Sequence, residues 1–282
     1  MKIKWWWPLA LVIIGGGLFL WGLSGDSAVR SEIFFPPDFD QFGTVDVDKL
    51  STNVPEPEGK ANFLIMGLDC EQADTQCRSD VIMVVRVNFD DHSVQLVSFA
   101  RDFWVYIPGV SPPFGKINCA AYGGPERMKA TLWENFGLAI NHYVVVDFED
   151  FRAIAEIVGL DGEQALAQAR NRSLTGGDFT RMRNQQELLI SLKEEALNPE
   201  TLSRLVVQIP SLLSAIETDL SDADIAVIAK WAIRDWGQIT ISGEVLDARY
   251  ATGSGYEAWG GYDLWVLYPD ESRICSFLDQ IE

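Results

Sequence analysis

The chain has 282 residues, of which 48% are hydrophobic and 22% are charged, and its formal net charge at pH 7 is −19. This composition excludes wholesale disorder and leaves enough apolar residues for a large core. The acidic balance argues against a nucleic-acid partner, so an anionic ligand requires a local cluster of cations.

The first residues predict a membrane anchor. An uncharged run from Trp5 to Ser24 follows Lys2 and Lys4, and about 20 helical residues span the hydrocarbon core of a bilayer. The lysines in front and Asp26 behind predict a cytoplasmic N-terminus. A cleaved signal peptide is the alternative, but the apolar run is long for one and no clear cleavage site follows. We therefore expect a single-pass membrane protein whose main domain is extracytoplasmic.

A stalk is expected next, because residues 25–60 are acidic, contain four prolines and show no helical period. Cysteines beyond the membrane are open to oxidation, and Cys70 and Cys77 form either a local disulfide or two free thiols. Cys119 and Cys275 lie among apolar residues and are expected in the core. The expected organisation is a cytoplasmic tip at 1–4, a transmembrane helix at 5–24, a stalk at 25–60 and one domain at 61–282.

From residue 62 onward, short runs rich in valine and isoleucine alternate with helical patterns. Helix starts are marked by Pro125, by aspartates, and by a capping box formed by Ser221 and Asp224. Together these patterns predict an α/β layered domain. Strands are expected at 62–67, 80–87, 93–99, 143–146, 239–246 and 265–267, and helices at 124–136, 147–158, 161–170, 178–196, 221–234 and after Asp270.

Charged residues gather at the junctions between these predicted elements. Arginine is the natural ligand of a phosphate, because its planar guanidinium offers paired donors and a permanent charge. Arginines together with carboxylates indicate a pyrophosphate that binds with a divalent cation. Ordinary surface ion pairs are the alternative interpretation. The junction residues are Asp69, Arg78, Asp80, Arg101, Asp102, Lys116, Arg170, Arg172, Asp178, Arg181, Arg183 and Gln185.

The order of these motifs carries more information than any one of them. In chain order they are Gly67-x-Asp69, Arg78-Ser-Asp80, Arg101-Asp102, Lys116-Ile-Asn118, Asp161-Gly-Glu-Gln164 with Arg170-x-Arg172, and Asp178-Phe-x-Arg181 with Gln185. This series resembles the LytR-CpsA-Psr family over nearly the whole region from about residue 62 to 281. The resemblance implies a central mixed sheet flanked by helices, preceded by one transmembrane helix.

The resemblance also implies a site and an activity. A glycopolymer phosphotransferase would move its polymer from a polyprenyl pyrophosphate carrier to peptidoglycan, with Mg²⁺ as cofactor and possible pyrophosphatase activity as a by-product. The resemblance implies catalytic roles for Arg101, Asp102 and Arg172. The pyrophosphate would be held by Arg78, Arg101, Lys116, Arg170, Arg172, Arg181 and Gln185, and the metal by Asp69 and Asp80.

Two departures from the family pattern are visible. The segment after Val158 joins the Asp161 motif almost directly, where the family has a longer stretch. Asn184 stands where arginine is common, and Arg183 is one position, or about 100° of helix, away. These departures keep open a non-catalytic polyprenyl-phosphate binding or scaffold protein. A transcriptional attenuator is disfavoured, because the expected cytoplasmic tip is too short for a DNA-binding module.

The roles of some single residues remain open. Asp102 either accepts the proton of the acceptor hydroxyl or orients Arg101 through an ion pair, and the second role is favoured. The two histidines, His92 and His142, lack the spacing of a zinc site, and His92 is expected in an exposed turn. Four tryptophans of the C-terminal third are expected in the core rather than on a glycan-stacking surface. These four are Trp231, Trp236, Trp259 and Trp265.

Overall fold

The computed structural model describes residues 59–69, 77–147, 216–235, 237–259 and 261–281, with a few single positions between 150 and 186. These residues belong to two compact units. The first includes described residues 88–94 and 216–242, and the second includes 61–87, 95–147 and 243–281.

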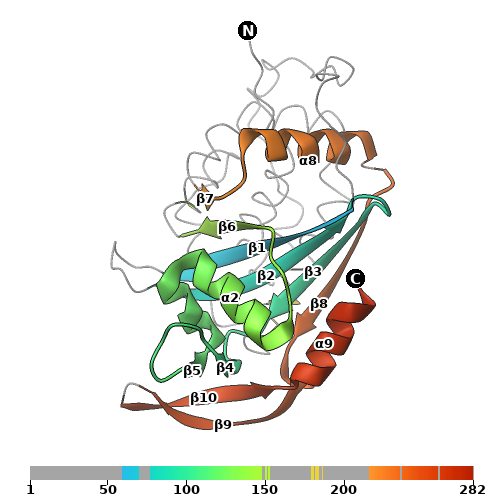
Figure 1. Cartoon of the computed structure of the whole chain (residues 1–282). Coiled ribbons are helices and arrows are strands. Elements are labelled where there is room, and N and C mark those ends of the chain that lie inside the picture. Colours follow the sequence, from blue (N-terminus) through green and yellow to red (C-terminus); the bar gives the residue numbers. More distant parts are fainter. Residues whose placement is uncertain are drawn as a thin grey trace, which may run out of the picture. The chain divides into compact units, whose positions relative to one another are not determined.

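A mixed sheet forms the core, as expected (Figure 1). Its strand order among the described residues is β7-β6-β1-β2-β3-β8. β1 and β6 are parallel, with Phe63 opposite His142 and Gly67 opposite Val146. β2 is buried along most of its length, in agreement with its apolar run from Val81 to Val85. The strands are β1 (Lys60–Asp69), β2 (Arg78–Asn88), β3 (Ser93–Phe99), β6 (His142–Val146), β7 (Glu217–Thr218) and β8 (Thr240–Leu246).

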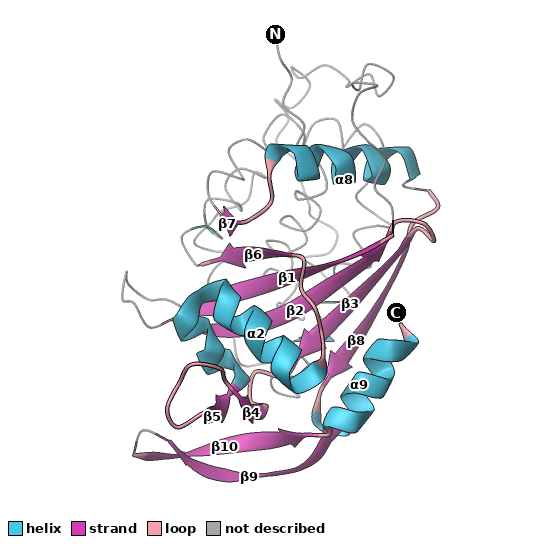
Figure 2. Ribbon diagram, viewed as in Figure 1, coloured by secondary structure: helices cyan, strands magenta, loops and turns pink. Residues whose placement is uncertain are grey.

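Two helices of the second unit, α2 (Gly124–Phe136) and α9 (Glu271–Gln280), pack near each other against the sheet (Figure 2). The Phe136 ring lies 5.4 Å from that of Phe99 on β3. On α9, the Leu278 carbonyl accepts a bond of 3.1 Å from Arg86 of β2. α2 has its predicted bounds and ends at Gly137, whose left-handed conformation (φ 65°) closes the helix. Asp270 caps α9 through the Arg273 N–H, also as predicted.

Two antiparallel ribbons complete the second unit, and the sequence patterns indicated only part of them. The first joins β4 (Trp104–Tyr106) to β5 (Phe114–Lys116). The second joins β9 (Ala251–Trp259) to β10 (Tyr262–Pro269). The sequence predicts a strand at 265–267 but misses β9, because its glycines and small polar residues lack an apolar alternation.

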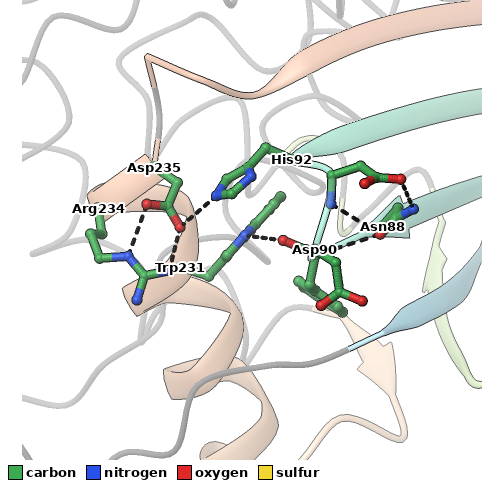
Figure 3. Close-up of polar contacts among 8 residues, drawn as sticks. Asn88, Asp90, His92, Trp231, Arg234 and Asp235 are labelled. Atoms are coloured by element: carbon green, nitrogen blue, oxygen red, sulfur yellow. Dashed lines mark hydrogen bonds and ion pairs between the residues drawn. The ribbon is translucent and has the colours of Figure 1, made fainter.

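In the first unit, the turn between β2 and β3 binds the end of helix α8 (Asp222–Asp235) (Figure 3). Trp231 is buried, as predicted. Its indole N–H donates to the Phe89 carbonyl at 3.2 Å, and its ring meets Phe89 edge-on at 5.0 Å. His92 lies in the predicted turn with a φ of 53°, but it is partly covered, because its Nε2 lies 3.2 Å from the Asp235 carboxylate. The predicted capping box of Ser221 and Asp224 starts the helix.

Asp235 lies at the negative end of a helix, where a carboxylate needs compensation. The guanidinium of Arg234 lowers the pKa of Asp235 through hydrogen bonds, and nearby His92 acts in the same direction. Because the folded pKa is lowered, this contribution to stability is present at neutral pH. It is lost as the pH falls through that pKa.

Several expectations concern residues outside this description. They include the transmembrane helix at 5–24, the stalk to residue 58, the helix at 161–170, and most of the helices at 147–158 and 178–196. Within the part of the chain that is described, no helix is long and apolar enough to cross a bilayer. Cys77 is disulfide-bonded, while its expected partner Cys70 lies outside the described residues. Cys119 is a buried free thiol, as predicted, and Cys275 is a partly buried one.

Candidate functional site

The Arg101-Asp102 pair lies in a turn between β3 and β4 that main-chain hydrogen bonds hold from several sides. Just before it, the Ala100 N–H donates to the Leu246 carbonyl of β8 at 3.1 Å. The Leu267 N–H of β10 donates to the Asp102 carbonyl at 2.9 Å. A turn fixed by two other strands presents its side chains in a preorganised way.

Lys116 reaches this turn because the β4–β5 ribbon continues beyond its last strand pair. Trp104 is opposite Lys116, and the Ile117 N–H then donates to the Phe103 carbonyl at 2.7 Å. The Asn118 N–H approaches the Arg101 carbonyl at 3.4 Å. Residues 116–118 therefore run antiparallel to 101–104, which brings the Lys116-Ile-Asn118 motif beside the Arg101-Asp102 motif.

Four charged side chains meet here in a continuous series of alternating sign, which we call the ion-pair cluster: Asp80, Arg101, Asp102 and Lys116. The Lys116 Nζ lies 2.6 Å from the Asp102 Oδ1, and the Arg101 Nη1 lies 2.6 Å from the Asp80 Oδ2. The Arg101 Nε is 3.9 Å from the Asp102 Oδ2. The four side chains are only 16–22% exposed, so solvent and salt screen them less than surface pairs.

Asp80 reaches the cluster from the start of β2, next to the end of β1. The Ser79 hydroxyl donates to the Gly67 carbonyl at 3.3 Å, which joins the two strand ends. A Cβ at Gly67 would stand 2.9 Å from the Val81 Cβ, so only glycine lets the strands approach this closely here. The backbone positions of Asp69 and Asp80 therefore lie on neighbouring strand ends. The side chain of Asp69 is not among the described ones.

One further cation, Arg78, lies near the buried Cys119 thiol together with Lys116 and the Tyr122 hydroxyl. Burial raises the pKa of the thiol, while the positive charges of Arg78 and Lys116 and a hydrogen bond with Tyr122 act in the opposite direction. Burial also raises the pKa of the Tyr122 hydroxyl. Arg78 therefore lies near the Lys116 end of the cluster. A thiol with a raised pKa stays protonated at neutral pH, so Cys119 is unsuited to be a nucleophile.

The structure thus brings together Arg78, Asp80, Arg101, Asp102 and Lys116 among the residues that the sequence predicts for the site. The favoured role of Asp102 agrees with the structure, since the Arg101 Nε lies 3.9 Å from the Asp102 Oδ2. Asp102 also has a shorter contact of 2.6 Å with Lys116, and Asp80 pairs with Arg101. The sequence does not predict the contact between Lys116 and Asp102 because that contact depends on the β4–β5 ribbon. Four predicted site residues lie outside the description: Arg170, Arg172, Arg181 and Gln185.

The region around residue 184 is described only in part. Met182 and Gln186 are buried and Arg183 is exposed, at helical positions. Tyr122 and the buried Asn118 adjoin the cluster, and the sequence assigns a site role to neither. In the sequence, the signal that could have identified them is the polar Asn118, two residues after the predicted site residue Lys116. A polar side chain that is buried, as Asn118 is, usually has a hydrogen-bond partner.

Among the described residues, Asp80 is the one whose side chain the sequence predicts as a ligand of a divalent cation. The Asp80 carboxylate is a hard oxygen donor, the type that Mg²⁺ prefers. Among the described side chains, no group of three or more His, Cys, Asp or Glu gathers as a metal centre. A cation here would therefore depend on Asp80 together with phosphate oxygens and water.

The described site is a half-buried cluster of cations and carboxylates at the strand ends of an α/β domain. The LytR-CpsA-Psr family model matches residues 40–159 and 157–253 of this chain. The chain belongs to the LytR-CpsA-Psr family.

Individual relatives agree with this assignment. Regulatory protein MsrR of Staphylococcus aureus strain COL is 32% identical over 195 residues, which cover 60% of this chain and 59% of that protein. The chain thus spans less than two thirds of the length of MsrR. The polyisoprenyl-teichoic acid–peptidoglycan teichoic acid transferase TagU of Bacillus cereus is 28% identical, covering 94% of this chain and 91% of TagU.

A solved structure supports the fold. The crystal structure of B. subtilis TagV superposes with a TM-score of 0.60, covering 79% of this chain and 97% of TagV at 22% identity. The expected α/β fold with a central mixed sheet is therefore confirmed.

Proposed function

We propose that this chain is a membrane-anchored phosphotransferase that moves a glycopolymer from a polyprenyl pyrophosphate carrier to peptidoglycan. The observation that carries the proposal is the ion-pair cluster, with Arg78 beside it, in a member of the LytR-CpsA-Psr family. The cluster suits an anionic substrate because Arg101 and Lys116 supply charge and directed donors. The activity named for TagU, the transfer of a polyisoprenyl-linked teichoic acid to peptidoglycan, supports the same reaction class.

In this reaction a hydroxyl of the peptidoglycan glycan attacks the glycopolymer-side phosphorus, and polyprenyl phosphate leaves. Arg101 and Lys116 neutralise the charge that grows on the phosphate oxygens, which is the main source of catalysis in phosphoryl transfer. Asp102 lies between these two cations and holds both in position. The proton of the attacking hydroxyl passes to water. Arg170, Arg172, Arg181 and Gln185 are proposed as further ligands of the pyrophosphate.

Asp80 and Asp69 are proposed to hold Mg²⁺, which would supply positive charge that stabilises the departing phosphate. Asp80→Asn keeps the shape of the side chain but removes its charge. We expect turnover of a lipid-pyrophosphate substrate to fall at least tenfold, and its magnesium requirement to rise, while binding of the lipid changes much less. EDTA should have the same effect on the wild type. The measurement is the rate of release of polyprenyl phosphate against magnesium concentration.

Glu126→Gln is the matched control, because it removes an ion-paired carboxylate from α2, outside the cluster. It should leave the magnesium curve unchanged. Turnover that is independent of magnesium in the wild type and in Asp80→Asn would contradict the metal assignment. A wild type that binds the lipid but never turns it over would instead identify a binding or scaffold protein.

The anchor is a separate part of the proposal, supported by the apolar run from Trp5 to Ser24 and its flanking charges. A cysteine introduced by Ser51→Cys, with Cys119 and Cys275 changed to alanine, should react with a membrane-impermeant maleimide in intact cells. The parent chain without Ser51→Cys measures the background from Cys70 and Cys77. A cysteine introduced by Lys2→Cys should react only after lysis. Labelling of Ser51→Cys only in lysed cells would overturn this topology.

A further inference from the structure

The β9–β10 ribbon carries a pair of large aromatic side chains on its outward face. Tyr256 of β9 lies directly opposite Trp265 of β10, and the two side chains are 72% and 38% exposed. Residues directly opposite each other on a strand pair have Cβ atoms about 5 Å apart and project from the same face. The two rings are therefore neighbours on one surface.

Tyr256 and Trp265 do not take part in the packing on the inward side of the ribbon. Val266 is fully buried, and the Tyr268 hydroxyl donates to the Glu257 carboxylate at 2.7 Å. Tyr268 also lies across Gly255, where a Cβ would stand 2.8 Å from the Tyr268 Oη. Because this packing supports the ribbon, folding supplies no reason for exposing a tyrosine and a tryptophan opposite each other. Their exposure points to a ligand.

This aromatic pair adjoins the ion-pair cluster. Two residues after Trp265, the Leu267 N–H donates to the Asp102 carbonyl at 2.9 Å. Two strand residues span about 7 Å, comparable to the width of one sugar ring. On β4–β5, Tyr106 and Phe114 form a second exposed cross-strand pair, with ring centroids 5.9 Å apart, two positions from Lys116. Figure 1 shows both ribbons at the same end of the second unit.

We propose that Tyr256 and Trp265 form a stacking platform for the uncharged pyranose rings of the acceptor glycan strand, an inference that rests on the proposed function. The apolar C–H face of a pyranose fits an aromatic ring, and the hydroxyls around its edge need polar partners. Asp263 and Ser254 of the same face supply such acceptors and donors. The carboxylates of Asp263 and Glu257 and the chain's charge of −19 disfavour a polyanion on this ribbon. The donor's phosphate belongs at the ion-pair cluster, so the ribbon suits the acceptor.

The direct test measures binding of a soluble N-acetylhexosamine oligomer to the full chain in detergent, by calorimetry. Tyr256→Ala and Trp265→Ala should each weaken binding about five- to tenfold, the usual effect of losing one stacked ring. Trp133→Ala is the matched control, because Trp133 is an exposed tryptophan on α2 with 56% exposure. It should leave oligomer binding unchanged. Unchanged binding in both ribbon variants would overturn the platform.

A kinetic measurement separates this inference from the proposed function. In the transfer reaction, both ribbon variants should raise KM for the acceptor glycan while kcat and KM for the lipid donor stay nearly constant. If the wild type transfers nothing but oligomer binding still depends on Tyr256 and Trp265, the proposed function fails and the platform stands. If the variants instead abolish self-association of the chain or its binding to neutral phosphatidylcholine vesicles, and oligomer binding is unaffected, the platform is wrong.

Discussion

Arg101→Ala should reduce transfer of the glycopolymer by at least tenfold. Arg101 is the centre of the ion-pair cluster, 2.6 Å from Asp80 and 3.9 Å from Asp102. In the proposed reaction, its loss would remove charge-assisted hydrogen bonds to the phosphate, each of which contributes roughly 1.5–3 kcal/mol. It also leaves two carboxylates close together, which repel the anionic substrate. Lipid-donor binding and single-turnover transfer, measured side by side, should both decline.

Two variants make this result specific. Arg101→Lys keeps the charge but not the planar fork, so its activity should lie between the wild type and Arg101→Ala. Arg249→Ala removes an arginine that is ion-paired with Asp247 and Glu244 outside the cluster. This control should lower stability while transfer per folded molecule stays within about twofold of wild type. A folded Arg101→Ala protein with normal transfer would mean that the ion-pair cluster only supports the fold.

Trp231→Ala should cause the largest loss of stability. Trp231 is buried between Phe89 and His92 and donates to the Phe89 carbonyl. Removing a buried tryptophan costs about 3–5 kcal/mol, a large part of the 5–15 kcal/mol that stabilises a typical domain. The midpoint of urea unfolding, followed by fluorescence and by circular dichroism, should fall accordingly.

Matched substitutions identify the cause of that loss. Trp231→Phe retains most of the apolar contact and loses the hydrogen bond, so it should cost only about 1–2 kcal/mol. Trp133→Ala removes a tryptophan from the exposed face of α2 and should change the unfolding free energy by less than about 0.5 kcal/mol. Equal effects at Trp133 and Trp231 would contradict the packing of α8 against the β2–β3 turn.

Much of the fold follows from local sequence signals. Helix α2 has its predicted bounds because Pro125 and Gly137 mark its ends physically. β3 is also predicted with its observed bounds, since its apolar residues alternate and a polar turn precedes it. The capping box of Ser221 and the capping aspartate of α9 form as predicted because their partners are within three residues.

The remaining features depend on contacts between distant residues. β9 has no clear pattern of its own and exists as the partner of β10. The pairing of Lys116 with Asp102 requires the β4–β5 ribbon, which places side chains 14 residues apart beside each other. The motif order indicates which residues gather, but not which cation faces which carboxylate. Trp265 is 38% exposed, so the expectation of a core residue was wrong; its position depends on the pairing of β10 with β9, which the sequence does not predict.

The turn that carries Arg101 and Asp102 is held by strands from the far end of the chain, and this has a consequence for biogenesis. Leu246 and Leu267 bond to the two sides of the turn, and the core is further tied by a bond between Arg86 and Leu278, 192 residues apart. During synthesis, the arginines and carboxylates of the turn leave the ribosome long before these strands do. Such a partly synthesised chain has the charges of the site without their arrangement, so the arrangement of the site should form only when synthesis of the chain is complete.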